Sequence, residues 1–149
     1  MKARGELRID PGTLERPGDE AVFQCVVVHS ERSVTAAVLR RATELLSGLN
    51  ARILLVAVHT VPFPAPLTGA SASHAHLVEQ LVDLASQCSL PVTPQVVLAR
   101  YWEEGFRFVL REESTVLVGT RKRLWRTDEE RLASTLANDG HKVALLHVA

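Results

Sequence analysis

Residues 115–148 read TVLVGTRKRLWRTDEERLASTLANDGHKVALLHV, with an apolar run at each end and a segment of helical spacing between them. The runs TVLV at 115–118 and VALLHV at 143–148 lack the polar–apolar alternation of a half-exposed strand, which favours strands buried on both faces. Thr127 stands three residues before Glu130, the spacing of a capping box at the start of a helix. The stretch therefore predicts a strand, a helix and a second strand.

The same alternation extends through the rest of the chain. Three more apolar runs, FQCVVV at 23–28, ILLVAV at 53–58 and VVLA at 96–99, predict buried strands. Ser30 stands where it can cap the first helix, and Gly48 stands where that helix should end. Helical spacing predicts that this helix buries one stripe of apolar residues: Val34, Ala37, Val38, Leu45 and Leu49.

Strands and helices that alternate in this way form an α/β fold. The order β-α-β-α-β-α-β-α-β requires a five-stranded parallel sheet with right-handed crossovers and helices on both faces, a Rossmann-like architecture. The order of the strands within the sheet does not follow from periodicity. Residues 1–21, with two Pro-Gly pairs among charged residues, predict an arm or linker, and residues 22–149 predict a single domain.

The composition argues against several kinds of partner. Lys and Arg together number 17, as do Asp and Glu, so the chain lacks the charge that nucleic acid or an anionic membrane attracts. No apolar run is as long as a membrane span and the N-terminus is too polar for a secretory signal, so we predict a cytoplasmic protein without membrane insertion. Cys25 and Cys88 are predicted to be buried, reduced thiols, and the isolated pair His74 and His76 predicts no metal site.

Ligands of open α/β sheets bind beyond the carboxyl ends of the strands, where the strand order reverses. The residues that follow the predicted strands include His29, Ser30, His59, Gly119 and Thr120. His29 and His59 could meet at this edge and titrate near neutral pH. The chain has no nucleophile elbow, P-loop or dinucleotide-binding glycine motif, so we predict that it is not an enzyme.

The frame of residues 23–148 resembles the universal stress protein family. The resemblance rests on VVV followed by His29, on LLVAVHTVPFP after the first helix, on VLVGT at the next-to-last strand and on the closing GHKVALL. It implies the strand order 3-2-1-4-5. It also implies an ATP site in which the glycines of G-x-x-G, nine residues and G-[S/T] let main-chain N–H groups approach the phosphates. Val58 falls at the family's adenine-contacting valine, and Gly119 at its first glycine.

The chain departs from the family's nucleotide motif at several positions. His29 replaces an aspartate, Lys122 replaces the second glycine, and Glu129-Glu130 replaces the G-[S/T] pair. Acidic side chains at a helix N-terminus repel phosphate, and side chains in place of glycine block the backbone. We therefore predict no bound ATP and no other cofactor. The candidate cleft consists of His29, Ser30, Val58, Gly119, Thr120 and Arg121.

Three functions remain open. The first is a non-catalytic, universal stress protein-like regulatory or interaction protein. In the second, the basic residues 121–123 bind ATP or another anion in place of the glycines, although the acidic residues 128–130 are the expected partners of this basic segment. The third is a cytosolic regulatory module related to those fused to amino acid transporters. PGTLERPG at 11–18 looks like a connector, and VPFPAPL at 61–67 resembles those modules.

The resemblance also implies a homodimer. In the family the last strand lies at the edge of the sheet, where its unpaired backbone can pair with a second copy about a two-fold axis. The predicted interface residues are Val143, Leu145 and His147. No pattern in the sequence names another protein partner.

Overall fold

The structure, a computed structural model, describes residues 22–67, 71–111 and 113–148, so the predicted arm at 1–21 lies outside the described residues. Strands and helices alternate as predicted. In chain order they are β2 (Phe23–Val28), α2 (Arg32–Leu45), β3 (Ala51–Thr60), α3 (Ala72–Ser86), β4 (Val92–Ala99), α4 (Trp102–Val109), β5 (Thr115–Arg121), α5 (Asp128–Asn138) and β6 (Lys142–Val148).

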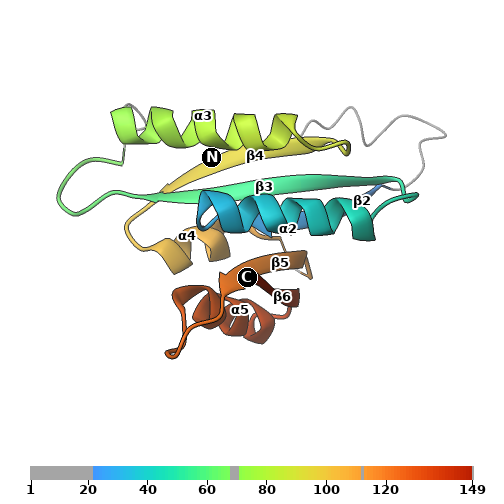
Figure 1. Cartoon of the computed structure of the whole chain (residues 1–149). Coiled ribbons are helices and arrows are strands. Elements are labelled where there is room, and N and C mark those ends of the chain that lie inside the picture. The colour runs from blue at the N-terminus through green and yellow to red at the C-terminus, as the bar shows by residue number, and fades with distance from the viewer. Residues whose placement is uncertain (1–21, 68–70, 112, 149) are drawn as a thin grey trace.

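The described strands form one parallel sheet in the order β4-β3-β2-β5-β6. Helices α2 and α3 cover one face of the sheet, and α4 and α5 cover the other (Figure 1). The chain starts in the central strand, moves outward through β3 and β4, and then crosses to β5 and β6 on the other side of β2. The predicted α/β fold and the order 3-2-1-4-5 are confirmed, and the strand order reverses at the carboxyl ends of β2 and β5.

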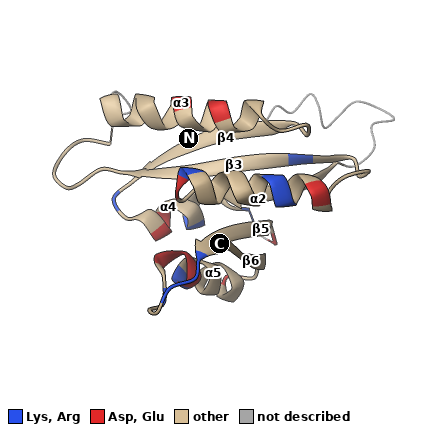
Figure 2. Cartoon of the chain, in the orientation of Figure 1, with Lys and Arg blue, Asp and Glu red and all other residues tan. Residues whose placement is uncertain are grey.

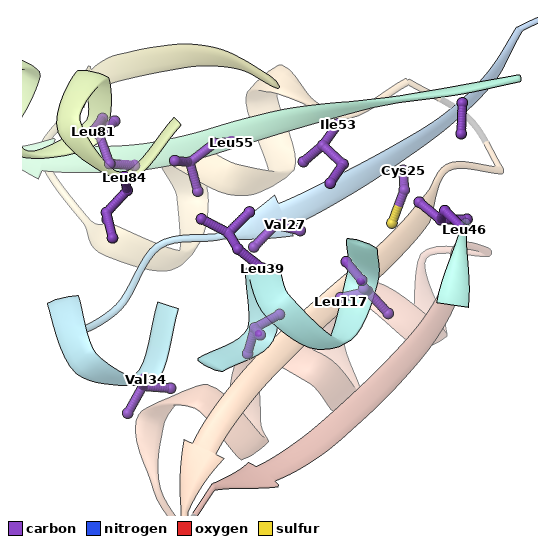
Figure 3. Packing of buried hydrophobic residues seen from close by; sticks show 14 residues of the cluster. Cys25, Val27, Val34, Leu39, Leu46, Ile53, Leu55, Leu81, Leu84 and Leu117 are labelled. Carbon is purple, nitrogen blue, oxygen red and sulfur yellow. The ribbon is translucent and has the colours of Figure 1, made fainter. Parts of the chain in front are cut away.

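Two apolar clusters hold the layers together, one on each face of the sheet. On the first face, Val27 and Leu55 of the sheet and Leu81 of α3 are fully buried in a cluster that α2 completes (Figure 3). On the second face, Phe106 of α4 and Leu136 of α5 are fully buried. Burial of each such side chain contributes about 1.5–3 kcal/mol, so both helical layers fix the sheet that carries the crevice described below.

The packed face of α2 agrees with the predicted stripe at Val34 and Val38, which are buried, and differs from it elsewhere. Leu45 and Leu49 are 55% and 56% exposed, whereas Thr35, Leu39 and Ala42 are buried. The prediction favoured the large apolar side chains of the segment. The helix instead turns toward the sheet a face that runs from Val34 to Ala42 and includes Thr35.

The start of α2 also differs from the prediction. The helix begins at Arg32, Glu31 is its N-cap residue, and no side chain caps it, so the prediction of Ser30 as the cap is wrong. The main-chain N–H of Ser30 donates instead to Thr35 Oγ1 at 3.2 Å. The end of the helix agrees with the prediction, because Gly48 follows it with φ at 85°, a conformation that glycine adopts readily.

The two outer strands are less buried than their apolar runs predicted. Residues of β4 and β6 alternate between half-buried and exposed over much of their length, because each strand lies at an edge of the sheet that a helix covers incompletely. The inner strands β2, β3 and β5 are largely buried, as predicted. No helix in the described ranges combines the length and the apolar character needed to cross a bilayer.

Candidate functional site

A narrow crevice lies at the carboxyl ends of β2 and β5, where the strand order reverses. Its volume is about 30 Å³, whereas small-molecule sites commonly measure about 300–1,000 Å³. The crevice leaves room for little more than water. It brings together four of the predicted cleft residues, Ser30, Gly119, Thr120 and Arg121. The full lining is Ser30, Glu31, Val34, Gly119, Thr120, Arg121, Arg123, Thr127 and Glu129.

An ion pair joins the start of α2 to the end of β5 at this crevice. Arg121 donates from Nε and from Nη2 to Glu31 Oε1, each at 3.1 Å, and from Nη2 to Ser33 Oγ at 2.5 Å. The hydrogen bond from Arg121, followed by that from Ser33, lowers the pKa of Glu31. Glu31 therefore stays charged at neutral pH and engages a cation that could otherwise face an anionic ligand.

The first turn of α5 is closed by its own polar groups. Thr127 Oγ1 accepts from the Glu130 N–H at 3.1 Å, and the Thr127 N–H donates to Glu130 Oε1 at 2.7 Å, which confirms the predicted capping box. The bond from the Thr127 N–H lowers the pKa of Glu130. The buried hydroxyl of Thr120 lies 2.8 Å from that of Thr127 and fixes the cap to β5. A capped N-terminus with acidic residues in its first turn is a poor site for an anion.

His29 lies at the end of β2 with only 6% of its surface exposed. Its Nδ1 is 3.0 Å from Thr35 Oγ1, which also accepts the Ser30 N–H. Burial, with a smaller effect of the Arg32 charge, lowers the pKa of His29 to about 4, so the ring is neutral at pH 7. A neutral, inward-bonded ring cannot serve as a charged group that faces a ligand.

His59 lies among other neighbours, with its ring centroid 6.0 Å from that of His74. The ring of His29 bonds to Thr35 instead, and the described interactions include no contact between His29 and His59. Within the residues that the structure describes, no group of three or more His, Cys, Asp or Glu side chains could hold a metal ion. Both cysteines are free. Cys25 is buried, which raises its pKa to about 11, and Cys88 is only half-buried, less than predicted.

Comparison with known proteins adds to this geometry. No protein-family model and no curated protein matches the sequence. The solved structure of a universal stress protein from Archaeoglobus fulgidus matches with a TM-score of 0.60 and 15% identity, over 85% of this chain and 93% of that chain. The chain has the universal stress protein fold. An identity this low shows the fold alone. What the crevice can bind must therefore be inferred from its own residues.

Two residues that matched nucleotide-binding positions of universal stress proteins are packing residues in this structure. A Cβ at Gly119 would lie 2.4 Å from Val38 Cγ2 and 2.8 Å from Val34 Cγ1, so the close contact of β5 with α2 accounts for a glycine. The methyl groups of Val58 face Gly105 of α4, where a Cβ would lie 2.6 Å away. Val58 is therefore part of the core and does not line the crevice.

The basic segment 121–126 comprises Arg121, the last residue of β5, and the loop that leads from β5 to α5, beside the acidic start of α5 (Figure 2). The predicted pairing of 121–123 with residues 128–130 is not among the described ion pairs. Arg121 pairs with Glu31, which lies 90 residues away in the sequence and was missed for that reason. Arg121 and Arg123 of this segment line the crevice, and Arg121 joins it to the start of α2.

A larger groove, of about 580 Å³, runs between this loop, α5 and the edge strand, and we call it the β6 groove. Leu124 and Trp125 of the loop are 96% and 83% exposed, and they stand at one end of it. No apolar pattern of the sequence predicted this groove, because its walls come from three separate elements. Its lining is Arg123, Leu124, Trp125, Arg126, Glu130, Ala133, Ser134, Ala137, Val143 and Leu145.

Proposed function

We propose that this chain is a non-catalytic regulatory or interaction protein of the cytoplasm that has the universal stress protein fold and does not bind ATP. The observation that carries the proposal is the crevice of about 30 Å³ at the strand ends. A site for a nucleoside triphosphate needs roughly ten times that volume or more. A triphosphate could enter only if the start of α2 and the start of α5 moved apart.

The groups that could bind a phosphate already have partners. Arg121 is bonded to Glu31 and Ser33, and the first turn of α5 is closed by Thr127 and Glu130. A ligand would have to replace these bonds with bonds of its own. This arrangement favours a crevice that holds β2, α2 and α5 together, and it weighs against the alternative of an anion site at residues 121–123.

The absence of ATP binding can be tested by thermal unfolding with ATP and magnesium. A ligand at a hundredfold excess over its Kd stabilises the folded state by about 2.7 kcal/mol. We expect no change in Tm at millimolar ATP, and no nucleotide in the supernatant of the denatured, freshly purified protein. The matched control is Arg121→Ala, in which the ion pair is lost. A rise in Tm with ATP that disappears in Arg121→Ala would contradict the proposal and support the anion site.

We further propose that the partner of this chain is a second copy, bound at β6. The Lys142 N–H donates to the Ser114 carbonyl at 2.9 Å, so Lys142 faces β5. Alternate residues of a parallel strand bond to opposite sides. The main-chain groups of Val143, Leu145 and His147, the predicted interface residues, therefore point outward from the sheet.

Two further features favour β6 over the other edge of the sheet. An antiparallel pairing centred on Leu145 sets that residue opposite itself and Val143 opposite the partner's His147, and each pair exchanges main-chain hydrogen bonds. The opposite edge is β4, and the carbonyl of Pro91, the residue just before that strand, accepts the Ile53 N–H at 2.9 Å. By the same alternation Pro94 faces outward, where it has no N–H to offer to another strand.

Cysteine cross-linking tests this register. In a Cys88→Ser background, Leu145→Cys places two thiols opposite each other, with Cα atoms about 5.5 Å apart, within the range of a disulfide. We expect mild oxidation to convert Leu145→Cys into a covalent dimer on a reducible gel. The matched control is Leu146→Cys, which lies opposite the partner's Ala144 and should cross-link far more slowly. Equal rates for the two variants, or a monomer at every concentration, would contradict the pairing.

A further inference from the structure

The β6 groove has a mixed lining, in which apolar residues of β6 and α5 lie beside charged and polar ones, and it has exposed apolar side chains at one end. Val143 and Leu145 of the edge strand line it and are partly buried against α5. Leu124 and Trp125 stand at the end formed by the loop, almost fully exposed. Ala137, near the end of α5, marks the other end. The groove thus adjoins the strand edge that we propose as the dimer interface, on the face of the sheet that α5 covers.

The register of the sheet shows which end of β6 lies beside the loop. Arg121, the last residue of β5, pairs with Val148, so the loop leaves the sheet beside the carboxyl end of β6 (Figure 1). Antiparallel pairing about Leu145 brings the partner's carboxyl end next to Val143. The partner's loop therefore arrives at the far end of the groove, beside Ala137. Because a two-fold axis perpendicular to the sheet keeps equivalent faces together, both grooves open on the same side.

We propose that Leu124 and Trp125 of each protomer pack into the Ala137–Val143 end of the partner's β6 groove. The proposal rests on the β6 homodimer proposed above and adds a contact that the strand pairing alone does not require. It gives the exposed indole an apolar cover, and large aromatic residues commonly supply much of the energy of an interface.

The charges around the groove agree with a second copy as the occupant. The last turn of α5 has no basic residue of its own and carries the negative end of the helix dipole, while its C-cap residue Asp139 is paired with Arg107 of α4 at 2.8 Å. The partner's loop would bring Lys122 and Arg123 to that end. Lys142 does not repel these cations, because it lies on the other face of the sheet. Side chains alternate between the two faces along a strand, and Val143 and Leu145 are on the face that α5 covers. The net charge of zero leaves no overall repulsion between two copies.

The fluorescence of Trp125 provides the test. The chain has two tryptophans, and Trp102→Phe leaves Trp125 as the sole reporter. We expect its emission to shift to the blue, and iodide quenching to fall, over the concentration range in which sedimentation shows the dimer forming. We expect Trp125→Ser to raise the dimer Kd at least tenfold. The matched control is Phe108→Ser, since Phe108 is 82% exposed and does not line the groove, and its Kd should stay within twofold of the parent value.

Each outcome separates this contact from the dimer itself. A dimer that cross-links through Leu145→Cys while Trp125 stays open to iodide would overturn the loop contact and leave the β6 pairing intact. A chain that remains monomeric, with Trp125 exposed at every concentration, would overturn both, whatever the result with ATP. If Trp125 were already shielded from iodide in the monomer, another segment of the same chain would be covering it. That result would also overturn the contact between the two copies.

Discussion

Acidification from pH 7.5 to pH 5.0 is expected to lower the free energy of unfolding by about 2 kcal/mol through His29 alone. The folded chain protonates this ring only below a pKa of about 4, whereas an unfolded histidine protonates near 6.5. Between these values the unfolded state binds more protons, so stability is full above pH 6.5 and is lost as the pH falls toward 4. Urea unfolding at the two pH values measures the loss.

The variant His29→Asn isolates this effect. Asparagine can still exchange a hydrogen bond with the Thr35 hydroxyl, but it does not titrate, so the loss of stability between pH 7.5 and 5.0 should largely disappear. The carboxyl groups of Glu31 and Glu130, whose pKa values are lowered, should add their own losses only at more acidic pH. If wild type and His29→Asn lost the same stability over this range, the buried, neutral state of His29 would be wrong.

The substitution Gly119→Ala is expected to destabilise the protein by about 1–3 kcal/mol, the usual effect of adding a methyl group to a filled core. The new Cβ would overlap the methyl groups of Val34 and Val38, and β-branched side chains have little freedom to rotate away. Equilibrium unfolding in urea measures the change. The result bears on function, because it would show that Gly119 is needed for packing against α2. A phosphate ligand would then not be needed to explain the glycine.

A double-mutant cycle with Val38→Ala supplies the control. Removal of the Val38 methyl groups makes room for the new Cβ, so the double variant should be more stable than the sum of the two single effects predicts, by about 0.5 kcal/mol or more. Strict additivity would show that Gly119 and Val38 do not compete for the same space, and the packing explanation would fail.

Most of the fold could be predicted from the sequence, because it depends on local patterns. The apolar runs located the strands, and the spacing of Thr127 and Glu130 located the start of α5, which the structure confirms as a capping box. The predicted stripe of α2 was partly wrong. The face that packs contains Thr35 and Ala42, which a search for large apolar residues overlooks. Burial of the edge strands was overestimated, since strand position within the sheet does not follow from periodicity.

The site could be predicted only in part. The reversal of strand order identified the correct end of the sheet and four of the lining residues. The partner of Arg121 could not be found, because Glu31 lies 90 residues away and neither residue belongs to a motif. Val58 was assigned to the cleft from a sequence position, which does not show that its side chain turns toward Gly105 and away from the crevice.

Pro94 also bears on how far the proposed dimer could grow. If the β6 edge pairs with itself as proposed, the sheet of the described residues keeps only the β4 edge for strand addition, and Pro94, the third residue of β4, offers no donor there. Further chains then cannot be added to the dimer by strand pairing at β6. Concentrated solutions should therefore contain a particle of fixed size and no extended β-fibre.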